Sequence, residues 1–135
     1  MASPTLQGRS ILIVEDEPLI VMDMTKCLET TGAAITSTNT LKHALLLTEH
    51  DGLAAAILDH SLGGGDSSAL CIRLTARGIP YLIYSGHLYI DGPCSGAPHL
   101  RKPATAEALV AAVEHLINGQ GPVQSNPEDA TDAIG

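Results

Sequence analysis

The chain has 135 residues, of which 44% are hydrophobic and 16% are charged, so it can form the core of one domain and is not a disordered protein. Its net charge of -8, with only seven Lys and Arg residues, excludes a surface built to bind the phosphates of a nucleic acid. No apolar run is long enough to span a bilayer, so we expect a cytoplasmic protein without a membrane contact.

Short β-rich runs alternate with helical periods along the chain, which predicts an α/β fold with a parallel sheet. The first strand is an aliphatic run at residues 10–14, and a helix follows from Pro18 to about Thr31, where Gly32 ends it. The further elements expected in chain order are a strand at 34–38, a helix from about 40, a strand at 54–58, a helix at about 66–76, strands at 81–84 and 98–101, and a helix from near 105.

The chain divides into a flexible N-terminus at residues 1–8, a folded domain at 9–118 and a disordered acidic tail at 119–135. Within the domain, residues 87–97 carry turn signals rather than a helical period. We therefore expect a fourth helix that is short or disordered. A glycine-rich loop at residues 63–65 is expected to be flexible.

Three cysteines, Cys27, Cys71 and Cys94, are an odd number without the spacing of a CxxC motif. Two of them fall in helix-like segments, where a free cysteine behaves as a small apolar group. The sequence therefore predicts free thiols in a reduced, intracellular protein.

Polar residues follow four of the predicted strands. Glu15 and Asp16 follow the first strand, Asp59 the third, Ser85 the fourth and Lys102 the fifth. Because the carboxyl ends of parallel strands meet at one edge of the sheet, we expect these side chains to share one cleft.

The chemistry of this set indicates phosphoryl transfer. Three neighbouring carboxylates repel one another unless a cation neutralises them, and oxygen ligands without His or Cys favour Mg²⁺ or Mn²⁺. The metal would offset charge while a carboxylate attacks a phosphoryl donor. The Lys102 ammonium and the Ser85 hydroxyl could then donate to phosphoryl oxygens.

Four segments, at residues 11–18, 57–62, 83–86 and 100–103, together resemble the signature segments of response-regulator receiver domains. The resemblance covers about residues 9–118. It implies a flavodoxin-like, doubly wound sheet of five parallel strands in the order 2-1-3-4-5.

The resemblance also implies a role for each matched acidic residue. It makes Asp59 the phosphoryl acceptor, Asp16 a direct metal ligand and Glu15 an acid linked to the metal through water. It assigns the backbone carbonyl of Ser61 to the metal shell, so the implied metal set is Glu15, Asp16, Asp59 and Ser61.

On the other side of the pocket, the resemblance makes Ser85 the switch hydroxyl and Lys102 the lysine that contacts the phosphoryl group. It implies a cis Lys102–Pro103 bond. The position of the family's switch aromatic is taken by His99, so the readout of phosphorylation differs or is lost. His87, two residues after Ser85, is either a residue that tunes the lifetime of the phosphoryl group or an ordinary surface histidine.

Residues 80–87 resemble a subgroup of single-domain receivers of alphaproteobacteria, in which the fourth helix is poorly formed and the kinases are of the HWE or a related class. Tyr84 departs from the small residue of that subgroup, and Ser85 replaces threonine. The resemblance implies a sensor histidine kinase as donor and an unknown downstream protein as target, or a role as a phosphate sink.

Other interpretations stay open at this stage. Glu15 and Asp16 could be helix N-terminal acids that interact with the helix dipole. The chain could be a small Mg²⁺-dependent phosphohydrolase, or a scaffold with the receiver fold that does not depend on phosphorylation.

Overall fold

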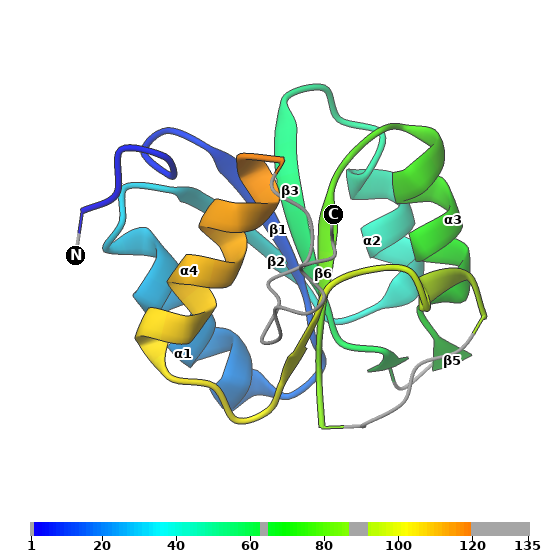
Figure 1. Cartoon of the computed structure of the whole chain (residues 1–135). Coiled ribbons are helices and arrows are strands. Elements are labelled where there is room, and N and C mark those ends of the chain that lie inside the picture. Colours follow the sequence, from blue (N-terminus) through cyan, green and yellow to red (C-terminus); the bar gives the residue numbers. More distant parts are fainter. Residues whose placement is uncertain (1, 63–64, 87–91, 120–135) are drawn as a thin grey trace, which may run out of the picture.

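A computed structural model describes residues 2–62, 65–86 and 92–119, whose backbone forms a five-stranded sheet flanked by helices and a separate two-stranded sheet (Figure 1). All five strands of the sheet run parallel, and their spatial order is β2 (Ala34–Thr38), β1 (Ser10–Val14), β3 (Leu53–Leu58), β6 (Tyr81–Ser85) and β7 (His99–Arg101). The helices are α1 (Pro18–Glu29), α2 (Leu41–Leu47), α3 (Ser68–Ala76) and α4 (Ala106–Ile117). The predicted doubly wound order 2-1-3-4-5 is confirmed.

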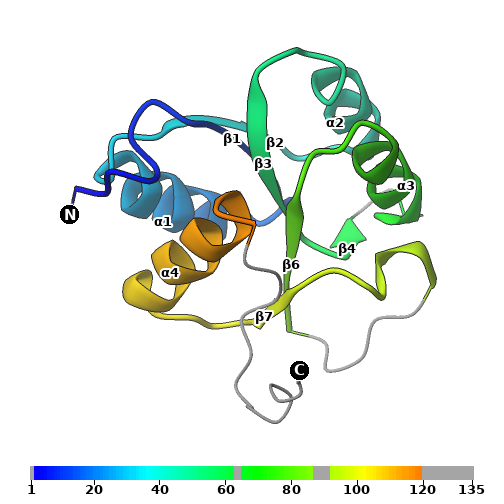
Figure 2. The same ribbon diagram turned by 45° about the horizontal axis from the view of Figure 1, so that its top comes forward.

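The helices cover both faces of the sheet, with α1 and α4 on one face and α2 and α3 on the other (Figures 1 and 2). Strand β1 shows why its residues 11–14 are all aliphatic. Ile11 and Ile13 pack into the core on the α1–α4 side, whereas Leu12 and Val14 pack into the core on the α2–α3 side. Successive side chains of a strand point to opposite faces, so a strand buried on both faces needs apolar residues at every position.

Helix starts follow local capping chemistry. The Thr40 hydroxyl accepts the His43 N–H at 3.2 Å before α2, and the Thr105 hydroxyl accepts the Ala108 N–H at 3.0 Å before α4. Pro18 opens α1, where its missing N–H leaves no bond unmade. No helix in the described ranges is long and apolar enough to cross a membrane.

The connections on either side of α3 and β6 depart from regular structure. After β3, two short strands, β4 (Ser61–Leu62) and β5 (Gly65–Asp66), pair antiparallel, while residues 63–64 of the glycine-rich loop lie outside the described residues. Between β6 and β7, the described residues contain one 3₁₀ turn, η1 (Gly92–Cys94). This agrees with the prediction of a short fourth helix, and His87 lies outside the described residues.

Residues 2–8 pack against the domain, which differs from the flexible N-terminus predicted at 1–8. Leu6 is fully buried in the core between α1 and α4, and the Ser3 hydroxyl donates to the Glu114 carboxylate at 2.6 Å. Burial of Leu6 and this hydrogen bond, with backbone bonds from Ser3 to Thr31 and from Gly8 to Gly32, together hold the segment in place. The predicted tail lies outside the described residues from position 120 on, so the boundaries at residues 9 and 118 stay predictions.

The prediction of three free cysteines is wrong for two of them. Cys71 of α3 and Cys94 of η1 form a disulfide, with their Cα atoms 5.5 Å apart and both side chains buried. Sequence spacing could not pair them, because 23 positions separate the two residues and only the fold brings them together. Cys27 is free, and burial, followed by the charge of Glu107, raises the pKa of its thiol.

We expect the Cys71–Cys94 bond to stabilise the domain by about 3 kcal/mol, because it limits the freedom of the unfolded chain. Chemical denaturation with and without dithiothreitol measures this difference. The double variant Cys71→Ala/Cys94→Ala should have the stability of the reduced wild type and no response to dithiothreitol. Cys27→Ala is the matched control and should keep the full response; equal stability of oxidised and reduced wild type would contradict the prediction.

Candidate functional site

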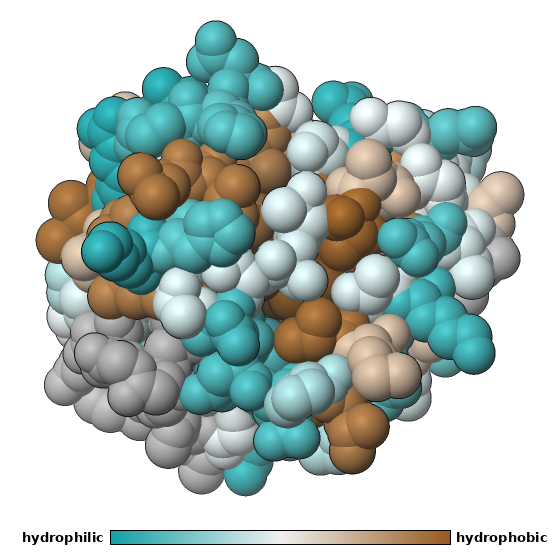
Figure 3. All heavy atoms as spheres, turned by 180° about the vertical axis from the view of Figure 1, so that it is seen from behind, coloured by the Kyte–Doolittle hydropathy of each residue, from teal (hydrophilic) through white to brown (hydrophobic). Residues whose placement is uncertain are grey.

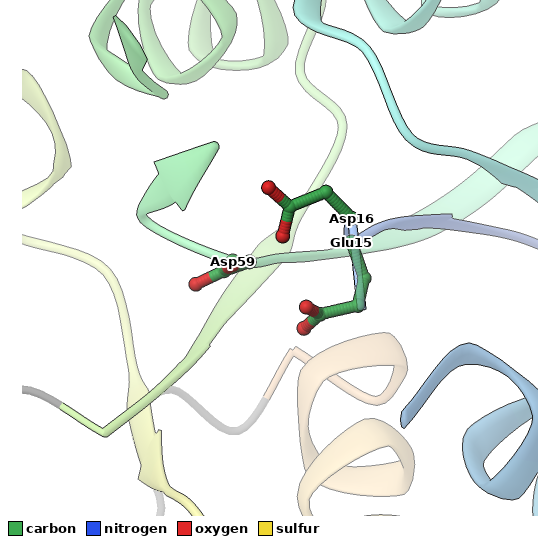
Figure 4. A group of neighbouring side chains, drawn as sticks. All are labelled: Glu15, Asp16 and Asp59. Carbon is green, nitrogen blue, oxygen red and sulfur yellow. The ribbon is translucent and has the colours of Figure 1, made fainter. Parts of the chain in front are cut away.

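Three carboxylates converge at the carboxyl end of the sheet. Glu15 and Asp16 directly follow β1, and Asp59 directly follows β3. Each offers an oxygen atom, and these oxygens lie within 4.8 Å of one another. In Figure 4 the side chains of Asp16 and Glu15 leave the backbone in opposite directions, and both bend towards the side where Asp59 lies. Glu15 and Asp59 are buried and Asp16 is exposed, so the cluster opens to solvent on the Asp16 side.

Backbone hydrogen bonds of the sheet fix this convergence. The Asp59 N–H donates to the Val14 carbonyl at 2.9 Å, which places Asp59 beside Glu15. The Glu15 N–H in turn donates to the Thr38 carbonyl at 3.1 Å. The acidic residues therefore occupy the first positions beyond a continuous strand ladder, where position depends on the register of the strands rather than on loop geometry.

Lys102 brings a positive charge into the same space. Its ammonium lies 2.8 Å from Glu15 Oε1 and 3.7 Å from Asp59 Oδ1. The Lys102 N–H donates to the Ser85 carbonyl at 2.9 Å, so pairing of β6 with β7 delivers the lysine to the site. The other Glu15 oxygen, Oε2, accepts the Glu17 N–H at 3.1 Å, which fixes the Glu15 carboxylate from the start of α1.

The net negative charge of the cluster favours binding of a cation. Three carboxylates face a single ammonium among the described residues, so negative charge remains in excess. Buried like charges destabilise one another unless a counter-ion is bound. Carboxylate oxygens at this spacing fit a hard divalent ion such as Mg²⁺, and no His or Cys belongs to the set.

The remaining predicted residues lie nearby. Ser85 is fully buried at the end of β6, next to the strand that ends before Lys102. Ser61 lies in β4, two positions after Asp59, and its role as a carbonyl ligand stays a prediction. The Lys102–Pro103 bond is cis, as expected from the resemblance. His99, which stands at the position of the family's switch aromatic, is exposed on β7.

Ser67 is a site residue that the sequence did not reveal. Its hydroxyl donates to the Asp59 carbonyl at 2.6 Å, and its side chain is fully buried. Ser67 precedes α3 in the position of a helix cap, yet its side chain caps no helix N–H. The hydrogen bond instead fixes the backbone of Asp59 against the start of α3. The sequence placed Ser67 inside the helix predicted at about 66–76, so only the structure reveals this contact.

Comparison with known proteins gives one set of matches. No protein-family model matches the chain, and neither does any curated protein. Among solved structures, SdrG from Sphingomonas melonis Fr1 is 35% identical with a TM-score of 0.72, over 85% of this chain and 99% of SdrG. A CheY-like response regulator receiver domain protein from Methanospirillum hungatei JF-1 is 21% identical with a TM-score of 0.76, over 84% of this chain and 97% of that chain.

A third solved structure shares the fold and holds a metal. The receiver domain of the sensor histidine kinase PA1611 from Pseudomonas aeruginosa PAO1 is 21% identical with a TM-score of 0.73, over 82% of this chain and 98% of that chain. That structure has a magnesium ion coordinated in its active site cleft. In this chain, the acidic cluster at the strand ends could hold a metal ion.

Substitution Asp16→Asn should change stability in opposite directions with and without metal. Without metal it should raise the free energy of unfolding by roughly 0.5–1 kcal/mol, because it removes one of three repelling charges. With Mg²⁺ at ten times its dissociation constant, the wild type should gain about 1.4 kcal/mol. The variant should gain less, since loss of a ligand weakens binding by about 10- to 100-fold.

Thermal unfolding in a Mg²⁺ titration measures both effects. Asp23→Asn is the matched control, because Asp23 is an exposed carboxylate of α1 outside the cluster. It should leave the Mg²⁺ response unchanged. If Asp16→Asn and Asp23→Asn respond alike to Mg²⁺, the acidic cluster is not the metal site.

Proposed function

Because the chain belongs to the response-regulator receiver family, we propose that Asp59 accepts a phosphoryl group and that the domain works as a signalling switch. The observation that carries this proposal is the meeting of Asp59 with Glu15, Asp16 and the Lys102 ammonium at the ends of three strands. A nucleophile, a candidate metal set and a cation for phosphoryl oxygens thus lie within reach of one another.

The reaction is a transfer of one phosphoryl group. A carboxylate oxygen of Asp59 attacks the phosphorus atom, and the bond from phosphorus to the donor atom breaks. The donor leaves as imidazole from a phosphohistidine, or as acetate from acetyl phosphate. Asp59 then carries an acyl phosphate, and later attack by water returns the carboxylate and releases inorganic phosphate.

Lys102 and Ser85 stabilise the transferred group by donating to its oxygens. Lys102 is already 3.7 Å from Asp59 Oδ1, so it needs only a small shift from Glu15 towards a phosphoryl oxygen. Most of the Lys102 side chain is buried, which strengthens such a charged hydrogen bond because water competes less for the ammonium.

Glu15, Asp16 and Asp59, with the carbonyl of Ser61, would hold the divalent ion, which we propose to be Mg²⁺ or Mn²⁺. When bound, the ion supplies positive charge against the phosphoryl oxygens. The same charge would weaken the attraction of Glu15 for the Lys102 ammonium.

Receiver domains in general interact with histidine kinases and with downstream proteins. For this chain we propose a sensor histidine kinase, of the HWE or a related class, as the donor in the cytoplasm. The output is then a contact with a downstream protein or the removal of phosphoryl groups from the kinase. Phosphotransfer in the presence of a second receiver of the same kinase separates these outputs, because a sink lowers phosphorylation of the second receiver.

Acetyl phosphate with Mg²⁺ should label the wild type with one phosphoryl group per chain, and Asp59→Asn should reduce the label to background because an amide is a poor nucleophile. The measurement is intact-protein mass, with hydroxylamine sensitivity as the test for an acyl phosphate. Asp51→Asn is the matched control, because Asp51 lies before β3 at the opposite edge of the sheet.

Asp51→Asn should be labelled like the wild type, and removal of Mg²⁺ by chelation should abolish labelling of both. Labelling of Asp59→Asn at the wild-type rate would contradict the assignment of Asp59. Rapid turnover of small phosphate esters, with many phosphates released per chain, would contradict a switch and indicate a phosphohydrolase instead.

A further inference from the structure

Tyr84 lies next to the site and belongs to none of the roles assigned above. It is the residue before Ser85 in β6, and its side chain packs in the core between the sheet and helices α1 and α4. Only 8% of Tyr84 is exposed. A tyrosine at a buried strand position has a hydroxyl group that needs a hydrogen-bond partner.

The Tyr84 hydroxyl finds its partner in the turn after β7. It accepts the Ala104 N–H at 3.1 Å, two residues beyond Lys102. Since the donor belongs to the backbone, this bond ties the turn between β7 and α4 to the neighbouring strand β6. The backbone that carries Lys102 is therefore held from both sides, by the Lys102 N–H bond to Ser85 and by the Tyr84 hydroxyl.

The Tyr84 ring also contacts the functional end of the same lysine. The Lys102 ammonium lies over the ring, 5.6 Å from its centroid, which is within the range of a cation–π interaction. The ring attracts the ammonium without accepting a conventional hydrogen bond from it. The N–H donors of the Lys102 ammonium therefore stay available for Glu15, for Asp59 or for a phosphoryl oxygen.

We propose that Tyr84 is a positioning residue, which holds the Lys102 ammonium between Glu15 and Asp59 so that it can meet the phosphoryl group. This inference rests on the proposed function of Asp59 and Lys102. A free lysine side chain has many rotamers, and a ring beneath its end reduces the number that must be given up when the phosphoryl group binds. Tyr84 itself touches no reacting atom and acts through Lys102.

Beryllofluoride, a stable mimic of a phosphoryl group, is the probe, and its affinity in the presence of Mg²⁺ is the readout. Tyr84→Leu removes both contacts and should weaken binding about tenfold. Tyr84→Phe keeps the ring and loses the hydroxyl, so it should weaken binding by about threefold and restore part of the loss. Tyr81→Leu is the matched control, because Tyr81 lies at the other end of β6 and its hydroxyl contacts Thr75.

A double-mutant cycle with Lys102→Met separates positioning from a structural role. If Tyr84 acts through Lys102, Tyr84→Leu should have almost no effect on affinity once Lys102 is absent. An equal loss of affinity in both backgrounds, or an equal loss for Tyr81→Leu, would overturn the proposal. If a thermal melt shows that Tyr84→Leu does not fold, the cycle is measured with Tyr84→Phe and Lys102→Met instead. The same two outcomes then apply.

Failure of this inference is distinguishable from failure of the proposed function. If acetyl phosphate does not label the wild type on Asp59, the function itself is wrong. If the wild type is labelled but the cycle between Tyr84 and Lys102 is additive, only the role of Tyr84 is wrong.

Discussion

Charge at one edge of the sheet is the constraint on which this domain depends. Strand register brings the carboxylates of Glu15, Asp16 and Asp59 together, and the Lys102 ammonium offsets only part of their charge. Such an arrangement is less stable than a neutral one, so it persists only because the aliphatic strands on either side hold it in place. The same excess charge makes the site receptive to a divalent ion. Stability of the metal-free domain is thus reduced in favour of binding.

Most of the fold could be predicted because its signals are local. Strand β1 ends where the aliphatic run at residues 11–14 ends, and Thr105 caps α4 as expected. The features that could not be predicted depend on contacts between residues that are far apart in the sequence. The burial of Leu6 and the bond between Cys71 and Cys94 need the finished fold, since no local pattern shows which surface will cover a leucine or which thiols will meet. Viewed from behind, the surface shows apolar areas on either side of a paler band, which the sequence pattern alone does not place (Figure 3).

The candidate site was predictable for a related reason. Its polar residues stand directly after strands, and parallel strands end at one edge, so the sequence was sufficient to bring Glu15, Asp59 and Lys102 together. Supporting contacts were not predictable. Ser67 fell inside a predicted helix, and Tyr84 was noted only as a departure from a small residue. Each uses its side-chain hydroxyl in a hydrogen bond to the backbone of another segment of the chain. Residue type alone does not indicate such a partner.

The bond between Cys71 and Cys94 has a mechanical consequence for the segment that joins Ser85 to Lys102. Because Cys94 is attached to helix α3, the 3₁₀ turn η1 is held against that helix part of the way between β6 and β7. A rearrangement of β6 would reach His99 directly through the pairing of β6 with β7, because Ile83 and His99 are register partners.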